Sequence, residues 1–142
     1  MPHILFDTSI YISAIRKGHA SVLALRNVGH DSPLWLSAVV LEELYAGASG
    51  PHIQSIAQFQ KDFERAGRIV LPNLTDWVQA GGVLSRLAEK YGYEQIGRGR
   101  LTNDALIAAS ARRLGIEVLT ANERDFRKLA EFRSFRYRVI TI

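Results

Sequence analysis

Residues 101–126 read LTNDALIAASARRLGIEVLTANERDF and carry the strongest structural signals in the sequence. After a polar pair at 102–103, apolar residues recur at helical spacing as far as Gly115, which predicts a helix with a clear start and stop. Residues 116–119 form a short, mainly apolar run, which predicts a buried strand. Polar residues from Thr120 onward predict a second helix, so we expect helix, strand and helix.

Polar side chains lie at the ends of these expected elements. We expect Asp104 in the first turn of the first helix, and Asn122 and Asp125 in the first turn of the second, just past the carboxyl end of the strand. In open α/β sheets, ligand sites form at that edge. Each residue also has a structural explanation, because Asn122-x-x-Asp125 fits a helix cap and an acid near a helix start complements the helix dipole.

The rest of the chain alternates short apolar runs with amphipathic segments, which predicts an α/β fold. The predicted strands are residues 3–6, 34–36, 68–72 and 136–142. The first predicted helix begins near residue 10. Further helices are predicted over residues 20–28, 38–47, 52–66 and 75–91. Ser37 and Thr75 are the expected N-caps of the helices that follow them. In helix 75–91, Trp77 and Val78 are expected on the apolar side.

Composition limits the classes of function. A chain of 142 residues can bury a core of its own, and we expect a single domain over residues 1–142. The absence of cysteine excludes structural disulfides, thiolate metal sites and cysteine nucleophiles. No apolar run approaches the roughly 20 residues of a membrane span, and the first residues do not resemble a signal peptide. We therefore expect a soluble, cytoplasmic protein without membrane association.

Basic residues outnumber acidic ones, with 18 Lys and Arg against 14 Asp and Glu and a formal net charge of +4. This excess fits a polyanionic partner, and it fits a basic surface without a specific role equally well. Arginines gather in and beside residues 101–126. If phosphate binds near Asp104, candidates to hold it include Arg98, Arg100 and Arg124.

Two further acids fit a site at the same edge of the sheet. Asp7 follows the first predicted strand, where an aspartate also fits a helix N-cap. Glu43 lies at the margin of the apolar face of helix 38–47, whereas Glu42 points away from it. An unpaired carboxylate that faces inward is costly. Because capping does not explain Glu43, the four acids together favour a site over separate structural roles.

The chemistry of these acids suggests a metal. Asp7, Glu43, Asp104 and Asp125 converge if their elements are neighbours in a parallel sheet, and clustered carboxylates stay ionised only beside a cation. Oxygen donors without cysteine or clustered histidine favour Mg²⁺ or Mn²⁺ over zinc. Beside arginines, such a site suits hydrolysis of a phosphodiester by metal-activated water, without a side-chain nucleophile.

At these residues the chain resembles the PIN-domain family and, within it, the VapC-type ribonuclease toxins of toxin–antitoxin pairs. The matching segments are Leu5-Phe6-Asp7-Thr8-Ser9, Leu36-Ser37-Ala38 through Glu43-Leu44 to Gly47-Ala48, Asp104 with Ile107-Ala108-Ala109, and Gly115 through Thr120-x-Asn122-x-x-Asp125-Phe126. They follow the family's order and spacing along nearly the whole chain.

The resemblance implies a single-domain, three-layer α/β/α fold with a mainly parallel sheet of about four to five strands. It implies a Mg²⁺- or Mn²⁺-dependent endoribonuclease, the toxin of a toxin–antitoxin pair, which forms homodimers and is neutralised by a cognate antitoxin. By position, the implied catalytic and metal-binding acids are Asp7, Glu43, Asp104 and Asp125, supported by Thr8, Thr120 and Asn122. The alternative is a catalytically silent PIN-like module that binds RNA or protein.

Overall fold

The structure is a computed structural model that describes residues 2–18, 32–93 and 100–141. The strands are β1 (Ile4–Phe6), β2 (Leu34–Ser37), β3 (Ile69–Val70), β4 (Glu117–Thr120) and β5 (Tyr137–Val139). They form one sheet in the order β3-β2-β1-β4-β5, and every strand pair within the described residues is parallel. The expected α/β fold with a parallel sheet is therefore confirmed.

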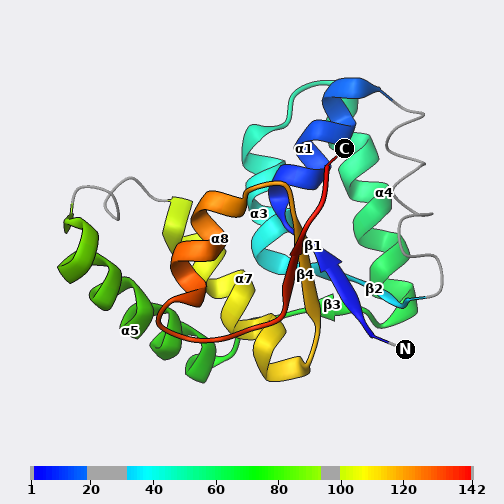
Figure 1. Ribbon diagram of the computed structural model, residues 1–142. Helices are drawn as coiled ribbons and strands as arrows, with labels where there is room; N and C mark the ends of the chain where they lie inside the picture. The colour runs from blue at the N-terminus through cyan, green and yellow to red at the C-terminus, as the bar shows by residue number, and fades with distance from the viewer. Residues whose placement is uncertain (1, 19–31, 94–99, 142) are drawn as a thin grey trace.

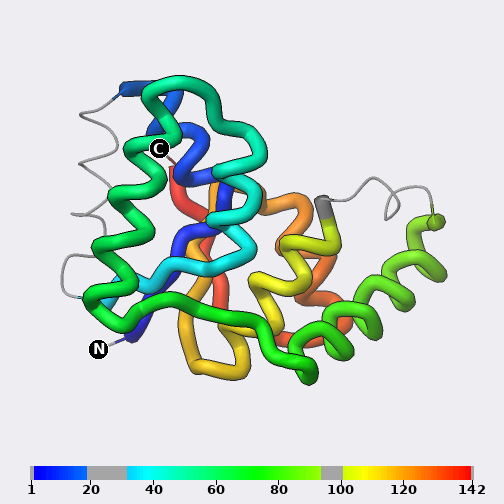
Figure 2. Tube along the Cα trace, turned by 180° about the vertical axis from the view of Figure 1, so that it is seen from behind, coloured from blue at the N-terminus to red at the C-terminus, as the bar shows by residue number. Residues whose placement is uncertain are grey.

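Helices cover both faces of this sheet (Figures 1 and 2). They are α1 (Thr8–Lys17), α3 (Ala38–Gly47), α4 (Pro51–Ala66), α5 (Leu74–Tyr91), α7 (Arg100–Leu114) and α8 (Glu123–Ala130). Helices α5, α7 and α8 lie on one side and α1 and α4 on the other, while α3 contacts α1, α4 and α7. This is the expected three-layer arrangement.

The central position of β1 determines where a site can form. Its three residues are fully buried, as is usual for a parallel strand covered on both faces. The chain moves outward from β1 to β2 and β3 and then returns to the other side of β1 as β4, so that Phe6 pairs with Leu119. The adjacent carboxyl ends of β1 and β4 therefore form a topological switch point, where a crevice opens.

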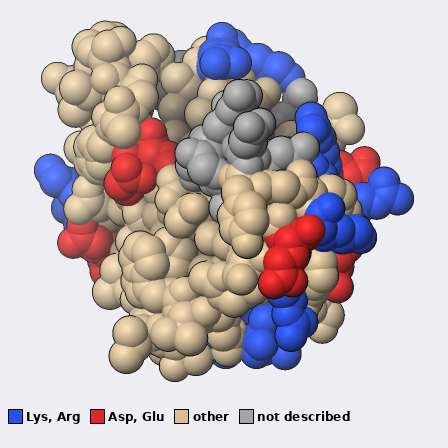
Figure 3. All heavy atoms as spheres, turned by 90° about the vertical axis from the view of Figure 1, so that its left-hand side faces the viewer, with Lys and Arg blue, Asp and Glu red and all other residues tan. Residues whose placement is uncertain are grey.

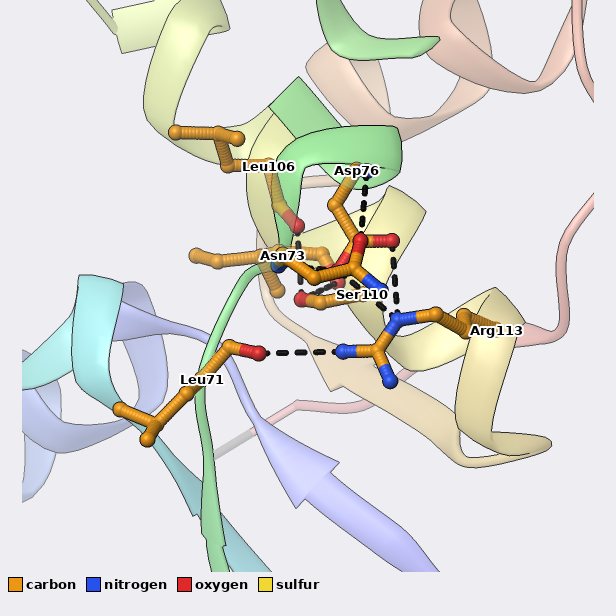
Figure 4. A network of polar contacts seen from close by, with 7 residues as sticks. Leu71, Asn73, Asp76, Leu106, Ser110 and Arg113 are labelled. Atoms are coloured by element: carbon orange, nitrogen blue, oxygen red, sulfur yellow. Dashed lines mark hydrogen bonds and ion pairs between the residues drawn. The ribbon is translucent and has the colours of Figure 1, made fainter. Parts of the chain in front are cut away.

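A partly buried ion pair joins the start of α5 to the end of α7 (Figure 4). The Nε of Arg113 lies 3.0 Å from Oδ2 of Asp76, and its Nη2 donates a hydrogen bond of 3.0 Å to the carbonyl of Leu71. Asp76 is fully buried and also forms a capping box with Asn73. The N-cap of α5 is therefore Asn73, and the expectation of Thr75 is wrong because Asp76 selects the earlier start.

Two other expectations about the helices are wrong. Helix α7 already includes Arg100, since Leu101 is buried in the core and extends the helix, so Asp104 lies beyond its first turn. Trp77 and Val78 do not face the core, because their exposed fractions are 55% and 67%. The helix predicted for residues 20–28 lies outside the described residues.

Within residues 2–18, 32–93 and 100–141, no helix combines the length and the apolar character of a membrane span.

Candidate functional site

Asp7 is the central acid of the candidate site. It follows β1 directly and is the N-cap of α1, where its Oδ1 accepts a hydrogen bond from the backbone N–H of Ile10 at 3.4 Å. Ser9 Oγ donates to the same oxygen at 2.6 Å, and Thr120 Oγ1 donates to Oδ2 at 2.6 Å. The capping explanation is therefore confirmed, although it accounts for only one of the three bonds that hold this carboxylate.

Burial dominates the electrostatics of Asp7. Only 2% of the residue is exposed, and this desolvation raises the pKa of its carboxyl above the ordinary value of 3.8. Hydrogen bonds from Ser9 and Thr120 pull the pKa the other way without cancelling the effect of burial. A carboxylate in such a position is stabilised by a nearby positive charge.

Glu43 enters the site from α3. It is half-buried, and its Oε1 accepts a hydrogen bond of 2.7 Å from Thr8 Oγ1. Its neighbour Glu42 is exposed, so the orientation predicted from the helical period is confirmed. Thr8 and Glu43 are 35 residues apart in the sequence, and their contact joins the start of α1 to α3.

These acids line a cleft of about 450 Å³ at the carboxyl ends of β1 and β4. The lining residues are Asp7, Thr8, Ser9, Ile12, Ser13, Arg16, Lys17, Glu43, Asp104 and Asn122. Three of the four predicted acids thus face one space, although they come from three separate segments of the chain. Asp104 is itself largely buried, on α7.

Asp125 does not line this cleft. Its backbone N–H donates to Asn122 Oδ1 at 3.3 Å, and its Oδ2 accepts from Asn122 Nδ2 at 2.8 Å. Asn122 is the N-cap of α8, as the capping explanation predicts, and its own N–H donates to Thr120 Oγ1 at 2.8 Å. Hydrogen bonds thus link Asp7 to Thr120, Thr120 to Asn122, and Asn122 to Asp125. Of these four residues, Asp7 and Asn122 line the cleft.

The donor chemistry of the cleft fits a hard divalent cation. Asp7, Glu43 and Asp104 supply carboxylate oxygens and Asn122 supplies an amide, which are the groups that Mg²⁺ and Mn²⁺ prefer. The part of the chain that the structure describes contains no group of three or more His, Asp or Glu side chains preassembled to hold a metal ion. The cleft therefore offers suitable ligands around a shared space and not a closed coordination cage.

The arginines expected near the site are placed differently. Arg98 lies outside the described residues, and Arg100 begins the observed part of α7 without a described side chain. Arg124 is exposed on α8 and does not line the cleft. Sequence reasoning missed Arg16 and Lys17, which do line it.

A signal for the missed residues is present in the sequence. Counting from Ser9, residues three or four apart lead through Ser13 to Arg16 and Lys17, which is the spacing of one helix face. Once Asp7 caps α1 at the switch point, this face turns toward the cleft.

Comparison with protein-family models matches residues 4–132 to the PIN domain. The chain belongs to the PIN-domain family. The family expected from the sequence is therefore confirmed, and the acids of this PIN domain lie in a cleft at the switch point of its sheet. None of the curated proteins compared with the sequence matches it.

Solved structures of similar fold include toxin–antitoxin complexes. DNA-bound VapBC from Salmonella typhimurium gives a TM-score of 0.68 at 20% identity, with 98% of each chain covered. VapBC-1 from nontypeable Haemophilus influenzae gives 0.64 at 23% identity, with 96% of each chain covered. FitAB bound to an IR36 DNA fragment gives 0.63 at 19% identity, covering 96% of this PIN domain and 94% of that chain. At these identities the likeness establishes the fold.

Proposed function

We propose that this PIN domain is a metal-dependent endoribonuclease and the toxin of a toxin–antitoxin pair. The observation that carries the proposal is the convergence of Asp7, Glu43 and Asp104 on one cleft. Helix capping explains the position of Asp7, and the packing of apolar side chains explains none of the three, because burial of a carboxylate is costly unless the group is paired or hydrogen-bonded. Three carboxylates around one space are instead suited to a cation-assisted reaction on a phosphodiester.

Asp7, Glu43 and Asp104, with the amide of Asn122, would hold Mg²⁺ or Mn²⁺, and Asp125 is the proposed fourth acid behind Asn122. A bound ion of this kind supplies a polarised phosphoryl oxygen and a water of lowered pKa. The residues of the chain supply orientation, since a site held by hydrogen bonds does not have to rearrange during the reaction.

Hydroxyl groups orient two of these acids, Asp7 and Glu43. Thr120 and Ser9 hold the two oxygens of Asp7, and Thr8 holds Glu43 through Oε1, each at 2.6 or 2.7 Å. One oxygen of Glu43 is left without a described hydrogen bond and can face the cleft. Thr8 and Thr120 are therefore proposed as supporting residues.

The test is cleavage of total cellular RNA by the purified full chain with Mg²⁺ or Mn²⁺, compared with the same reaction in EDTA. Asp104→Asn and Glu43→Gln are expected to abolish cleavage, whereas Glu42→Gln is the matched control, because its neighbouring carboxylate is exposed. Cleavage that survives both site substitutions would refute the proposal. Binding of RNA without cleavage under any condition would favour the silent binding module.

We further propose a cognate antitoxin as the protein partner and the cytoplasm as the place of action. The support is the similarity of the fold to chains from VapBC complexes. Purification of the tagged full chain from its host cells, followed by identification of any protein that co-elutes, tests the partner; a chain that elutes alone would contradict it.

A homodimer is proposed on the strength of an exposed apolar strip on α5. Leu74, Trp77 and Val78 lie one turn apart with exposed fractions of 79%, 55% and 67%. Gly81 and Gly82 continue the strip, and a Cβ at either position would meet no other part of the chain. Figure 3, viewed from this side, shows a broad area without charged side chains. Contiguous apolar surface of this kind is typical of an interface.

A further inference from the structure

The last turn of α1 forms a part of the cleft wall that the proposed chemistry leaves without a role. Arg16 and Lys17 lie there, in the same cleft as Asp7, Glu43 and Asp104. We propose that Arg16 and Lys17 form a subsite that binds the RNA backbone at phosphates beside the one that is cleaved. This inference rests on the proposed ribonuclease function and names where its substrate lies.

The geometry of α1 places the two cations at a suitable distance from the acids. Nine residues separate Asp7 from Arg16, and a rise of about 1.5 Å per residue puts their backbones about 13 Å apart. Side chains of a helix lean toward its N-terminus, so those of Arg16 and Lys17 lean back over Ser13 toward the acids. A strand of RNA along this face would meet carboxylates at one end of α1 and cations at the other.

Arg16 and Lys17 are also available for a ligand. Both are exposed, and neither has a hydrogen bond or ion pair with another described residue. Two other basic side chains, by contrast, are paired within the chain: Arg113 with Asp76, and Lys90 with Glu131 at 2.8 Å. The two cations on the cleft wall therefore carry charge that no other described residue neutralises.

The cleft needs such charge if it accepts RNA. Its three carboxylates repel a phosphodiester, and the cation proposed to bind there offsets them only at the point of cleavage. Phosphates on either side require positive charge from the chain, which is the usual source of affinity and register for nucleic acid. Among the residues that line the cleft, Arg16 and Lys17 are the basic ones.

Basic residues in a last turn also complement the helix dipole. The helix dipole therefore explains why residues 16 and 17 are positively charged. It explains Arg65 in the last turn of α4 equally well, although Arg65 does not line the cleft. Arg65 and Lys61 therefore provide a matched control, since both are exposed and lie on a single helix.

The experiment compares Arg16→Gln/Lys17→Gln with Lys61→Gln/Arg65→Gln, which remove the same charge. Binding of a fluorescein-labelled single-stranded RNA of mixed sequence is followed by anisotropy in the full chain carrying Asp104→Asn, with Mg²⁺ present. We expect the α1 pair to weaken binding about tenfold at low salt. The slope of log affinity against log salt should become shallower by about 0.7 for each phosphate that the variant no longer neutralises. The α4 pair should change the affinity by less than about twofold and leave the slope as in the parent.

Cleavage assays of the two double variants without the Asp104 substitution distinguish failure of the proposed subsite from failure of the proposed ribonuclease function. If the α1 pair binds and cuts RNA as the α4 pair does while the parent chain cuts normally, the subsite is refuted and the proposed function stands. If the parent chain neither binds nor cuts RNA, both proposals fail. Thermal unfolding of each variant should stay within a few degrees of the parent, which shows that any loss concerns RNA and not the fold.

Discussion

Replacing Thr120 by valine should show how the fold prepares Asp7. Thr120 is fully buried, donates a hydrogen bond of 2.6 Å to Asp7 Oδ2 and accepts one of 2.8 Å from the backbone N–H of Asn122. Valine keeps the branched shape and removes both bonds. A hydrogen bond to a charged group contributes about 1.5–3 kcal/mol, and water can reach the partly exposed Asn122, so we expect a loss of about 2–3 kcal/mol.

The measurement is urea denaturation of the metal-free protein at pH 8, where the midpoint should fall with an unchanged slope. The control is Thr75→Val on α5, which is exposed and should change stability by less than about 0.5 kcal/mol. Since the Thr120 bond lowers the pKa of Asp7, its removal should also raise that pKa further.

A double-mutant cycle decides whether the loss belongs to the contact with Asp7. In an Asp7→Asn background, Thr120→Val should cost clearly less than in the parent, because the charge-assisted part of the bond is already gone. Equal costs in the two backgrounds would refute the reasoning, as would a valine variant as stable as the parent.

Three further outcomes are expected. Because burial raises the pKa of Asp7, the free energy of unfolding of the metal-free protein should fall as pH rises through that pKa. Asp7→Asn should remove this pH dependence in denaturation experiments and abolish cleavage. An unchanged pH dependence would contradict the assignment of the effect to Asp7. Trp77→Ser should shift the sedimentation of the proposed homodimer toward the monomer, and an unchanged distribution would exclude the α5 strip from the interface. Arg113→Gln should lower the free energy of unfolding by about 1–3 kcal/mol, because it removes the ionic partner of buried Asp76 and leaves only the capping contacts with Asn73. Arg86→Gln, which alters an exposed arginine, should change the stability by less than about 0.5 kcal/mol.

Local signals in the sequence predicted the elements whose boundaries depend on local chemistry. Ser37 caps α3, and α3 covers Ala38–Gly47 as predicted, because a cap and a breaker on either side of an apolar run are sufficient. The inward turn of Glu43 followed from the helical period alone. The strands that lead to Asp7 and Thr120 are parallel neighbours, as expected from the polar residues at their carboxyl ends.

Packing between distant segments decided the boundaries that the sequence did not reveal. Asn73 and Thr75 are both good caps, and the choice depends on Asp76, whose partner Arg113 is 37 residues away. The start of α7 depends on the burial of Leu101. The prediction that Trp77 faces the core fails because apolar residues lie on more than one face of α5, and periodicity does not tell which of these faces packs inside.

For a related reason, the sequence does not reveal that Arg16 and Lys17 line the cleft. Arg16 and Lys17 end a helix, where basic residues are common and local. Their position on the cleft wall is clear only in the folded structure, where α1 lies beside Glu43 and Asp104 from later parts of the chain. Proximity to Asp104 in the sequence favours other arginines, such as Arg124, which does not line the cleft.

The hydrogen bond between Thr120 and Asp7 can form only late in translation. Its partners are 113 residues apart, so Asp7 leaves the ribosome long before β4 exists to pair with β1. At about 5–20 residues per second, this interval lasts roughly 6–23 s. Throughout that time the first carboxylate has no hydroxyl from β4 to hold it and no neighbouring strand on that side. For the proposed ribonuclease, the three acids and the hydroxyl that holds Asp7 are consequently not assembled until nearly all of the chain has been made.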